Sequence, residues 1–191
     1  MKVLAINGSA RRAGNTQTLI DTTLAPLREA GIECEVISLA GLTIGGCTAC
    51  AICKREKDRA CHGRTDDLNP LLEKVWEADA LIVASPTYFA DVTTEVKAFI
   101  DRVGYVARAN DQLLSRKIGA PLVSARRAGA IHTLDSIVHL FTICDMVTVG
   151  STYWPLAYGG LPGEVSKDDE GLRTATRLGE NIAWLLEKLA E

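Results

Sequence analysis

The fold is decided by the stretch Val3-Leu4-Ala5-Ile6-Asn7-Gly8-Ser9-Ala10-Arg11-Arg12-Ala13-Gly14-Asn15-Thr16, near the start of the chain. Its opening apolar run is typical of a strand that is buried on both faces of a sheet. The small polar residues that follow predict a turn. From about Thr16 to Ala30, apolar residues recur at helical spacing. A strand, a polar loop and a helix in this order predict an α/β protein.

Strands and helices are expected to alternate along the rest of the chain. The remaining predicted strands are short apolar runs, at 34–39, 81–84, 117–124 and 146–149. The remaining predicted helices carry apolar stripes, at 69–78, 93–103, 133–143 and 168–189. Helical crossovers join parallel strands with right-handed connections, so the pattern predicts a five-stranded parallel sheet with helices on both faces. The strand count matches the order 2-1-3-4-5, in which the ligand lies outside the carboxyl ends of the strands, at the loops after strands one, three and four.

Length and composition indicate one globular domain over residues 1–191. Hydrophobic residues make up 47% of the chain and charged residues 24%, which is ordinary for a soluble domain. The net charge is -3 with both signs interspersed, which argues against a nucleic-acid partner. The N-terminal apolar run is too short for a signal peptide, and no stretch approaches the roughly 20 apolar residues of a membrane span. We therefore expect a cytoplasmic protein without a membrane or nucleic-acid partner.

The loop over residues 8–16 is a candidate anion site. It is rich in small polar residues, carries two arginines and leads directly into a predicted helix, so that backbone N–H groups and the positive helix end converge. The Walker and dinucleotide-binding glycine patterns are both absent, which disfavours an ATPase or a Rossmann dehydrogenase. A plain strand-to-helix turn, capped by Asn15 or Thr16, is the alternative.

Three segments together resemble the NADPH-dependent FMN reductase and iron–sulfur flavoprotein family of flavodoxin-like proteins. These are Asn7–Thr16, the run Ser85-Pro86-Thr87-Tyr88-Phe89, and Val96-Lys97-Ala98-Phe99-Ile100-Asp101-Arg102. Their order and separation fit the family across nearly the whole chain. The resemblance implies a three-layer flavodoxin-like sandwich that binds FMN and acts as an oxidoreductase, with NAD(P)H as an electron donor. It also implies a homodimer or homotetramer.

The same resemblance assigns the flavin-binding residues. The phosphate is expected at the first loop, on Ser9, Arg11, Gly14, Asn15 and Thr16. The ring is expected beside the loop after the third strand, on Pro86, Thr87, Tyr88 and Phe89, although the two aromatic residues could instead cover the sheet end. The third wall is the loop after the fourth strand, with Ser124, Arg126 and Gly129. No catalytic acid or base is expected, because the flavin itself carries the chemistry.

For several other charged residues, the sequence leaves more than one role open. Arg126 and Arg127 could face a dinucleotide phosphate, a partner protein or water. In relatives, the helix that carries Arg102 tends to pack against another subunit, so interface, surface and chemical roles all stay open for it. Asp66 and Asp67 are expected to cap the helix that follows them.

Four of the six cysteines lie close together, at Cys47, Cys50, Cys53 and Cys61. In a reducing compartment such a group indicates a metal, iron–sulfur or redox site. The first intervals equal those of bacterial ferredoxin motifs, whereas structural zinc prefers two well-separated Cys-x2-Cys pairs. The resemblance implies a [4Fe–4S] cluster on these four residues. A Cys50–Cys53 redox pair, zinc and unliganded thiols remain alternatives.

Three functions are compatible with these patterns. The first is an FMN-dependent oxidoreductase that passes electrons from NAD(P)H or a protein donor to a flavin, quinone, metal or protein acceptor. The second is an electron carrier that holds FMN and a cysteine-bound [4Fe–4S] cluster. The third is a flavin-free α/β regulatory module with a zinc-binding loop.

Overall fold

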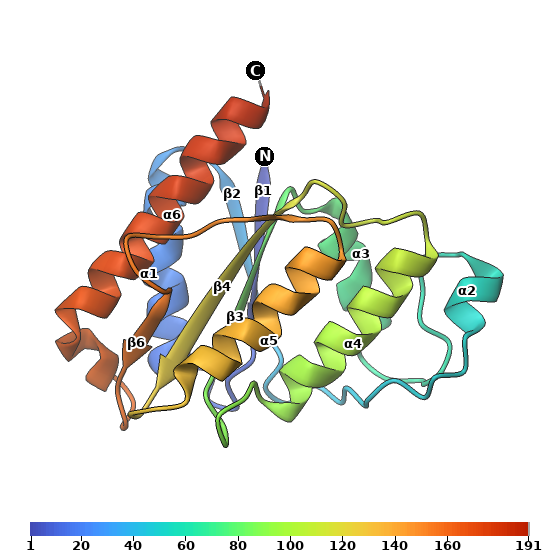
Figure 1. Cartoon of the computed structure of the whole chain (residues 1–191), viewed down its shortest axis with the longest axis horizontal. Coiled ribbons are helices and arrows are strands. Elements are labelled where there is room, and N and C mark those ends of the chain that lie inside the picture. Colours follow the sequence, from blue (N-terminus) through green and yellow to red (C-terminus); the bar gives the residue numbers. More distant parts are fainter. Residues whose placement is uncertain (191) are drawn as a thin grey trace.

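The computed structural model describes residues 1–190 and places a parallel sheet between two layers of helices (Figure 1). The central strands are joined in the order 2-1-3-4-5. Every neighbouring pair is parallel: β2 (Glu33–Ser38), β1 (Lys2–Asn7), β3 (Ala80–Pro86), β4 (Ile118–Ala125) and β5 (Val147–Thr148). The predicted topology and flavodoxin-like class are therefore confirmed.

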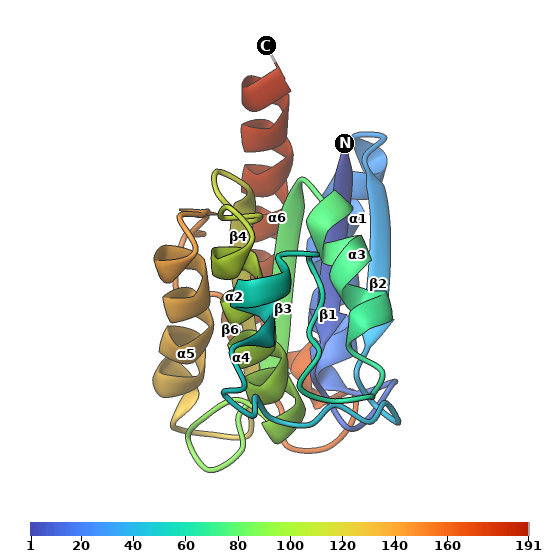
Figure 2. The ribbon, with the colours of Figure 1, turned by 90° about the vertical axis from the view of Figure 1, so that its right-hand side faces the viewer.

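Helices cover both faces of this sheet (Figure 2). One face packs against α1 (Asn15–Glu29) and α6 (Asp169–Ala190), and the other against α3 (Asn69–Glu77), α4 (Thr94–Ala109) and α5 (Ala130–Ile143). In β1, Val3 and Ala5 belong to the first core, and Leu4 and Ile6 to the second. Burial on both faces explains why this strand is continuously apolar. Within residues 1–190, no helix has both the length and the apolar character to cross a bilayer.

The predicted strand count was wrong by one. A sixth strand, β6 (Leu156–Tyr158), pairs with Val123–Ala125 of β4, whereas β5 pairs only with Ile118 and Gly119. Because β5 is just two residues long, the carboxyl half of β4 is left for β6. Three residues are too few for a recognisable alternation in the sequence.

Four helical segments also differ from the prediction. Helix α4 continues to Ala109, and α5 begins at Ala130. Two short segments were not predicted, α2 (Ile52–Glu56) inside the cysteine loop and the 3-10 turn η1 (Glu164–Lys167). Each spans at most about one helical turn, which leaves no periodic signal.

The loops after β1, β3 and β4 meet at the carboxyl edge of the sheet, as predicted (Figure 1). Gly8 N–H donates to Ala84 O at 2.8 Å, and Thr87 N–H donates to Ser124 O at 2.8 Å. Gly8 also lies directly against helix α4, because a Cβ atom here would stand 2.0 Å from Val96 Cγ2. Only glycine allows this close approach of strand end and helix.

Candidate functional site

The first loop presents unpaired backbone donors at the start of α1. The N-cap residue Gly14 provides no side-chain cap, and the first helical bond runs from Thr18 N–H to Gly14 O. The N–H groups of residues 15–17 therefore have no acceptor within the helix. Ser9 Oγ accepts from Arg11 N–H at 3.1 Å and keeps its own proton for donation. This arrangement is suited to binding an anion.

Three of the predicted phosphate and wall residues are already engaged within the protein. The Asn15 amide donates to Gly159 O at 2.8 Å and Leu161 O at 2.9 Å, which fastens the loop after β6. The hydroxyl oxygens of Thr16 and Ser124 lie 2.8 Å apart, and both side chains are buried. These contacts join the loops around the site. A direct role of the three side chains in holding FMN stays a prediction.

The loop after β3 makes a tight turn that projects an aromatic side chain. Tyr88 and Asp91 exchange backbone hydrogen bonds, while Phe89 and Ala90 take positive φ angles of 48° and 63°. Such angles are unfavourable for residues other than glycine. The Phe89 side chain is 107% exposed and Tyr88 is 48% exposed, so Phe89 does not cover the sheet end. The turn thus presents aromatic surface at the edge where the flavin is expected.

Gly129 allows the loop after β4 to approach this turn. It has a φ of +84°, and a Cβ atom here would stand 3.0 Å from Ala90 Cβ. Thr133 Oγ1 donates to Thr87 Oγ1 at 3.1 Å, which adds a second link between the two loops. Pro86 ends β3 and is partly buried, whereas Arg126 and Arg127 are exposed. The second and third loops therefore form one connected wall.

The four clustered cysteines line a single cavity of about 210 Å³. None of them forms a disulfide; Cys47 and Cys50 are exposed, whereas Cys53 and Cys61 are partly buried. Among residues 1–190, no three His, Cys, Asp or Glu side chains converge closely enough for a single metal ion. Zinc would need sulfur ligands at about 2.3 Å from one centre. The arrangement is a cavity surrounded by thiols rather than a preformed one-ion site.

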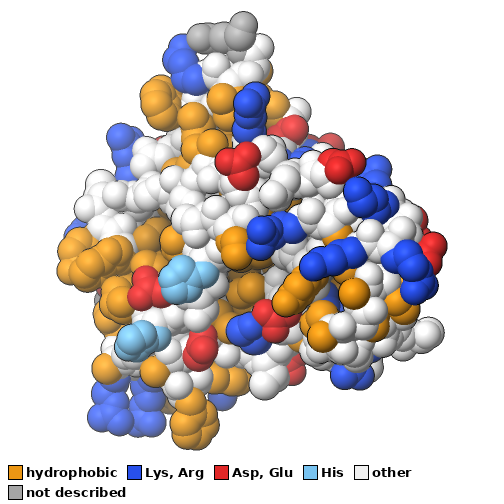
Figure 3. All heavy atoms as spheres, turned by 45° about the vertical axis from the view of Figure 1, so that its right-hand side comes forward, with side chains coloured by type: hydrophobic (Ala, Val, Ile, Leu, Met, Phe, Trp, Pro, Cys, Tyr) orange, Lys and Arg blue, Asp and Glu red, His pale blue; other side chains and the backbone are white. Residues whose placement is uncertain are grey.

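The surroundings of the thiols shift their pKa values in opposite directions. Burial raises the pKa of Cys53, and the neighbouring thiols Cys61, Cys47 and Cys50 raise it further. In contrast, hydrogen bonds from the backbone N–H of Ile52 and from the Thr48 side chain lower the pKa of Cys50. Lys and Arg side chains gather on this side of the molecule, around α2 and α4 (Figure 3). The loop therefore lies in a locally basic setting although the chain is acidic overall.

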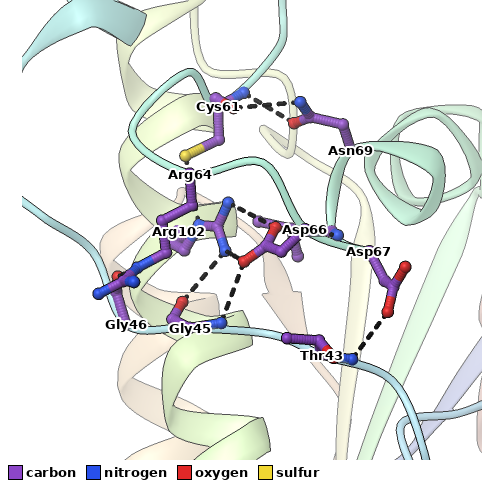
Figure 4. Close-up of polar contacts among 10 residues, drawn as sticks. Thr43, Gly45, Gly46, Cys61, Arg64, Asp66, Asp67, Asn69 and Arg102 are labelled. Carbon is purple, nitrogen blue, oxygen red and sulfur yellow. Dashed lines mark hydrogen bonds and ion pairs between the residues drawn. The ribbon is translucent and has the colours of Figure 1, made fainter.

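A buried ion pair lies beneath the cysteine loop (Figure 4). The Arg102 side chain is only 1% exposed, and its Nη2 donates to Asp66 Oδ1 at 3.0 Å while Nη1 donates to Asp66 Oδ2. Nη1 also donates to Gly45 O at 3.1 Å. Arg102 is therefore neither a surface nor an interface residue in this chain. Burial by itself would lower the pKa of Arg102, but hydrogen bonds to Asp66 and Cys61 raise it.

The predicted capping role of Asp66 and Asp67 was wrong. Helix α3 has Leu68 at its N-cap and no side-chain cap. Asp66 turns toward Arg102, and Asp67 accepts the backbone N–H of Thr43 at 2.7 Å. Both carboxylates thus fasten the segment before the cysteine loop. Asp66 still accepts the N–H of Leu68 at 3.3 Å, but Leu68 is the N-cap itself, so no free N–H group of the first helical turn is satisfied.

Cys61 is the most firmly held of the four cysteines. Its backbone N–H donates to Asn69 Oδ1 at 2.9 Å, and its carbonyl accepts from Asn69 Nδ2 at 3.1 Å. Its sulfur accepts a hydrogen bond from Arg102 Nε at 3.2 Å. Figure 4 shows the Cys61 sulfur on one side of the guanidinium and the Asp66 carboxylate on the other.

Helix α4 connects the two loop regions. Thr93, its N-cap, accepts Val96 N–H and donates its hydroxyl to Gly8 O at 2.9 Å, so this end of α4 contacts the loop after β1. Arg102 contacts the cysteine loop nine residues further along the same helix. At about 1.5 Å per residue, the two contacts are roughly 14 Å apart along the axis. One helix therefore fixes the loop after β1 relative to Cys61.

The Asp66–Arg102 pair predicts an acid dependence of stability. Burial would raise the pKa of Asp66, but hydrogen bonds from Arg102 and from the N–H groups of Gly45 and Leu68 hold it below its ordinary value. This stabilisation is complete above the unfolded-state pKa of about 4 and is lost as the pH falls through the lower folded value. In urea unfolding from pH 6 downward, Asp66→Asn is expected to flatten the acid loss of the unfolding free energy. Equal slopes in Asp66→Asn and in the wild type would refute the assignment.

Comparison with known proteins agrees with this geometry. The model of the NADPH-dependent FMN reductase family matches residues 1–160. The chain belongs to this family. Among curated relatives, an iron–sulfur flavoprotein of Methanocaldococcus jannaschii is 38% identical over 193 residues, covering 98% of each protein. One of Archaeoglobus fulgidus is 33% identical over 188 residues, covering 98% of this chain and 81% of that protein.

The similarity extends to solved folds. A flavodoxin from the domain Archaea superposes with a TM-score of 0.64 at 19% identity, covering 98% of this chain and 99% of that one. At this identity the likeness shows the fold alone. Family membership makes the chain an FMN-dependent oxidoreductase, as the resemblance implied.

Sequence reasoning missed the polar network below the cysteines. Arg102, Asp66 and Asn69 all hold the cysteine loop through hydrogen bonds. One signal was present, because Arg102 lies on the same helical stripe as Phe99, Val103 and Val106, which are all buried. A charge within an apolar stripe predicts a buried partner, but its identity comes only from the tertiary structure.

Proposed function

We propose that this member of the FMN reductase family is an iron–sulfur flavoprotein. It would bind FMN at the loops after β1, β3 and β4 and a [4Fe–4S] cluster on Cys47, Cys50, Cys53 and Cys61. The observation that carries the proposal is that all four thiols line one cavity. Relatives named iron–sulfur flavoproteins, which match over nearly the whole chain, support it.

The residues of the first loop fit a flavin phosphate. The uncapped start of α1 offers backbone donors, Ser9 offers a hydroxyl, and Arg11 is exposed beside them. Tyr88 and Phe89 supply apolar surface for the ring. FMN, when bound, supplies the electron and hydride chemistry, and the chain supplies position and hydrogen bonds.

The cysteine residues fit a compact cluster better than a single ion. A cluster fills the space between its ligands, so it needs a cavity with thiols around it, as in this loop. The third thiol is carried by α2 and the fourth is held by Asn69 and Arg102. Electrons would pass between the cysteine loop and the flavin edge, which α4 holds in a fixed relation. NAD(P)H or a protein would be the donor, and a small molecule or a protein the acceptor.

Anaerobic purification followed by an absorption spectrum and assays for iron and acid-labile sulfide tests the proposal. Flavin bands together with stoichiometric iron and sulfide are expected. If the protein binds flavin but no iron after reconstitution with ferrous iron and sulfide, the cluster assignment is refuted and the assignment as an FMN oxidoreductase is kept. A colourless protein with stoichiometric zinc would overturn both cofactors.

The phosphate assignment predicts unequal effects for two adjacent arginines. Arg12 already donates to Ala40 O at 3.0 Å, whereas Arg11 is exposed beside the start of α1. Arg11→Gln is expected to weaken FMN binding by about 10- to 100-fold, because a charge-assisted hydrogen bond contributes about 1.5–3 kcal/mol. Arg12→Gln is the matched control and should change binding by less than about threefold. Flavin fluorescence titration of the apoprotein measures both; equal losses would contradict the assignment.

A second candidate is a pure electron carrier with the same two cofactors. It is favoured by the basic surroundings of the cysteine loop, since charged patches steer protein partners. Steady-state oxidation of NADPH or NADH by the loaded protein separates the two, because a carrier alone shows little turnover. We further propose a single domain that acts as a cytoplasmic homodimer or homotetramer, which sedimentation of the loaded protein tests.

A further inference from the structure

Of the four clustered cysteines, only Cys61 accepts a hydrogen bond from the buried Arg102. Its Nε donates to the sulfur of Cys61 at 3.2 Å, and no other guanidinium–sulfur hydrogen bond occurs within residues 1–190. The arginine is 1% exposed, so its charge acts on this sulfur with little screening by water or salt. By contrast, Lys54 and Arg64, which also line the thiol cavity, are exposed.

The donor is fixed in direction. Two nitrogens of the guanidinium are held by the Asp66 carboxylate, and Nη1 also donates to Gly45 O. The third nitrogen, Nε, donates to the sulfur of Cys61, and the backbone of Cys61 is held by hydrogen bonds with Asn69 (Figure 4). Donor and acceptor are therefore positioned before any group fills the cavity.

We propose that Arg102 is a positioning residue that raises the reduction potential of a group bound through Cys61, and that the Asp66 carboxylate opposes this effect. The inference rests on the proposed function. A hydrogen bond and a nearby positive charge both stabilise a cysteine sulfur that becomes more electron-rich on reduction, so they raise the potential. Asp66 offsets part of this charge. Loss of the cation and loss of the anion should therefore shift the potential in opposite directions.

The test compares reconstituted proteins in a redox titration followed by electron paramagnetic resonance. Arg102→Gln is expected to lower the midpoint potential by at least about 59 mV. This shift is a tenfold change in the equilibrium constant of a one-electron reduction. The double variant Arg102→Gln with Asp66→Asn should lower it less, because the pair's net charge is unchanged and only the charged donor is lost. Asp66→Asn alone should raise it.

Arg108→Gln is the matched control, since it removes the same charge from an exposed position of the same helix. It is expected to shift the equilibrium by less than about twofold. FMN content, which reports on the opposite end of α4, verifies that each variant is folded. If Arg102→Gln does not fold, the double variant takes its place, because it leaves no buried carboxylate without a charged partner. Its midpoint potential should then lie below that of the wild type.

Two failures are distinguishable. A wild-type protein that takes up no iron and sulfide overturns the proposed function, and this inference with it. A loaded wild type whose Arg102 variants titrate like Arg108→Gln overturns the inference alone. The same holds if Asp66→Asn and Arg102→Gln shift the potential in the same direction.

Discussion

Replacement of Cys47 by Ser is expected to remove iron and acid-labile sulfide from the protein while FMN stays bound. Cys47 is exposed and lines the thiol cavity, so its substitution removes a ligand without disturbing the core. We expect at least about a tenfold loss of iron after reconstitution, because weaker changes in the surroundings of a metal site already cost 10- to 100-fold in affinity. The measurement is iron and sulfide per flavin.

This variant also separates the cluster from a dithiol. A Cys50–Cys53 redox pair does not need Cys47, so a functional pair would survive the substitution and still titrate with a thiol reagent. Cys34→Ser is the control, since Cys34 lies on β2 and does not line the cavity. Full iron content in Cys47→Ser, or equal loss in Cys34→Ser, would contradict the four-cysteine assignment.

Asp66→Ala is expected to be the most destabilising single change in the cysteine region. It leaves the Arg102 guanidinium buried without its carboxylate, and breaking a buried pair in this way costs about 3–5 kcal/mol. The adjacent Asp67→Ala removes one exposed contact to Thr43 and should cost about 1 kcal/mol or less. Urea unfolding of the FMN-loaded proteins at pH 7 measures the difference.

The two aspartates are neighbours with the same chemistry, so the comparison isolates burial and pairing. Similar unfolding free energies for both variants would show that the pair contributes little. A further readout is local, because Arg102 also contacts Gly45 and Cys61. Hydrogen exchange of residues 45–66 should accelerate in Asp66→Ala before the sheet opens.

Prediction from the sequence succeeded where the pattern is local and periodic. The continuously apolar run of β1 predicted a strand covered on both faces, and both cores confirm it. It failed at β6, which is too short to show a period and forms only because β5 leaves part of β4 unpaired. It also misjudged Asp66, because a neighbouring helix start suggested a cap, while the charged partner of this carboxylate lies 36 residues away.

The sequence by itself determined the class of the fold, the small polar loop that leads into α1 and the four closely spaced thiols of the cysteine loop. These follow from neighbouring residues, since backbone donors, helix starts and cysteine spacing are local properties. Only the tertiary structure decided that Arg102 is buried against Cys61 and Asp66, and that Asn15, Thr16 and Ser124 join loops. Such contacts depend on how distant segments pack. The physical reason is that burial, which removes water as a competing partner, is a property of the packed whole.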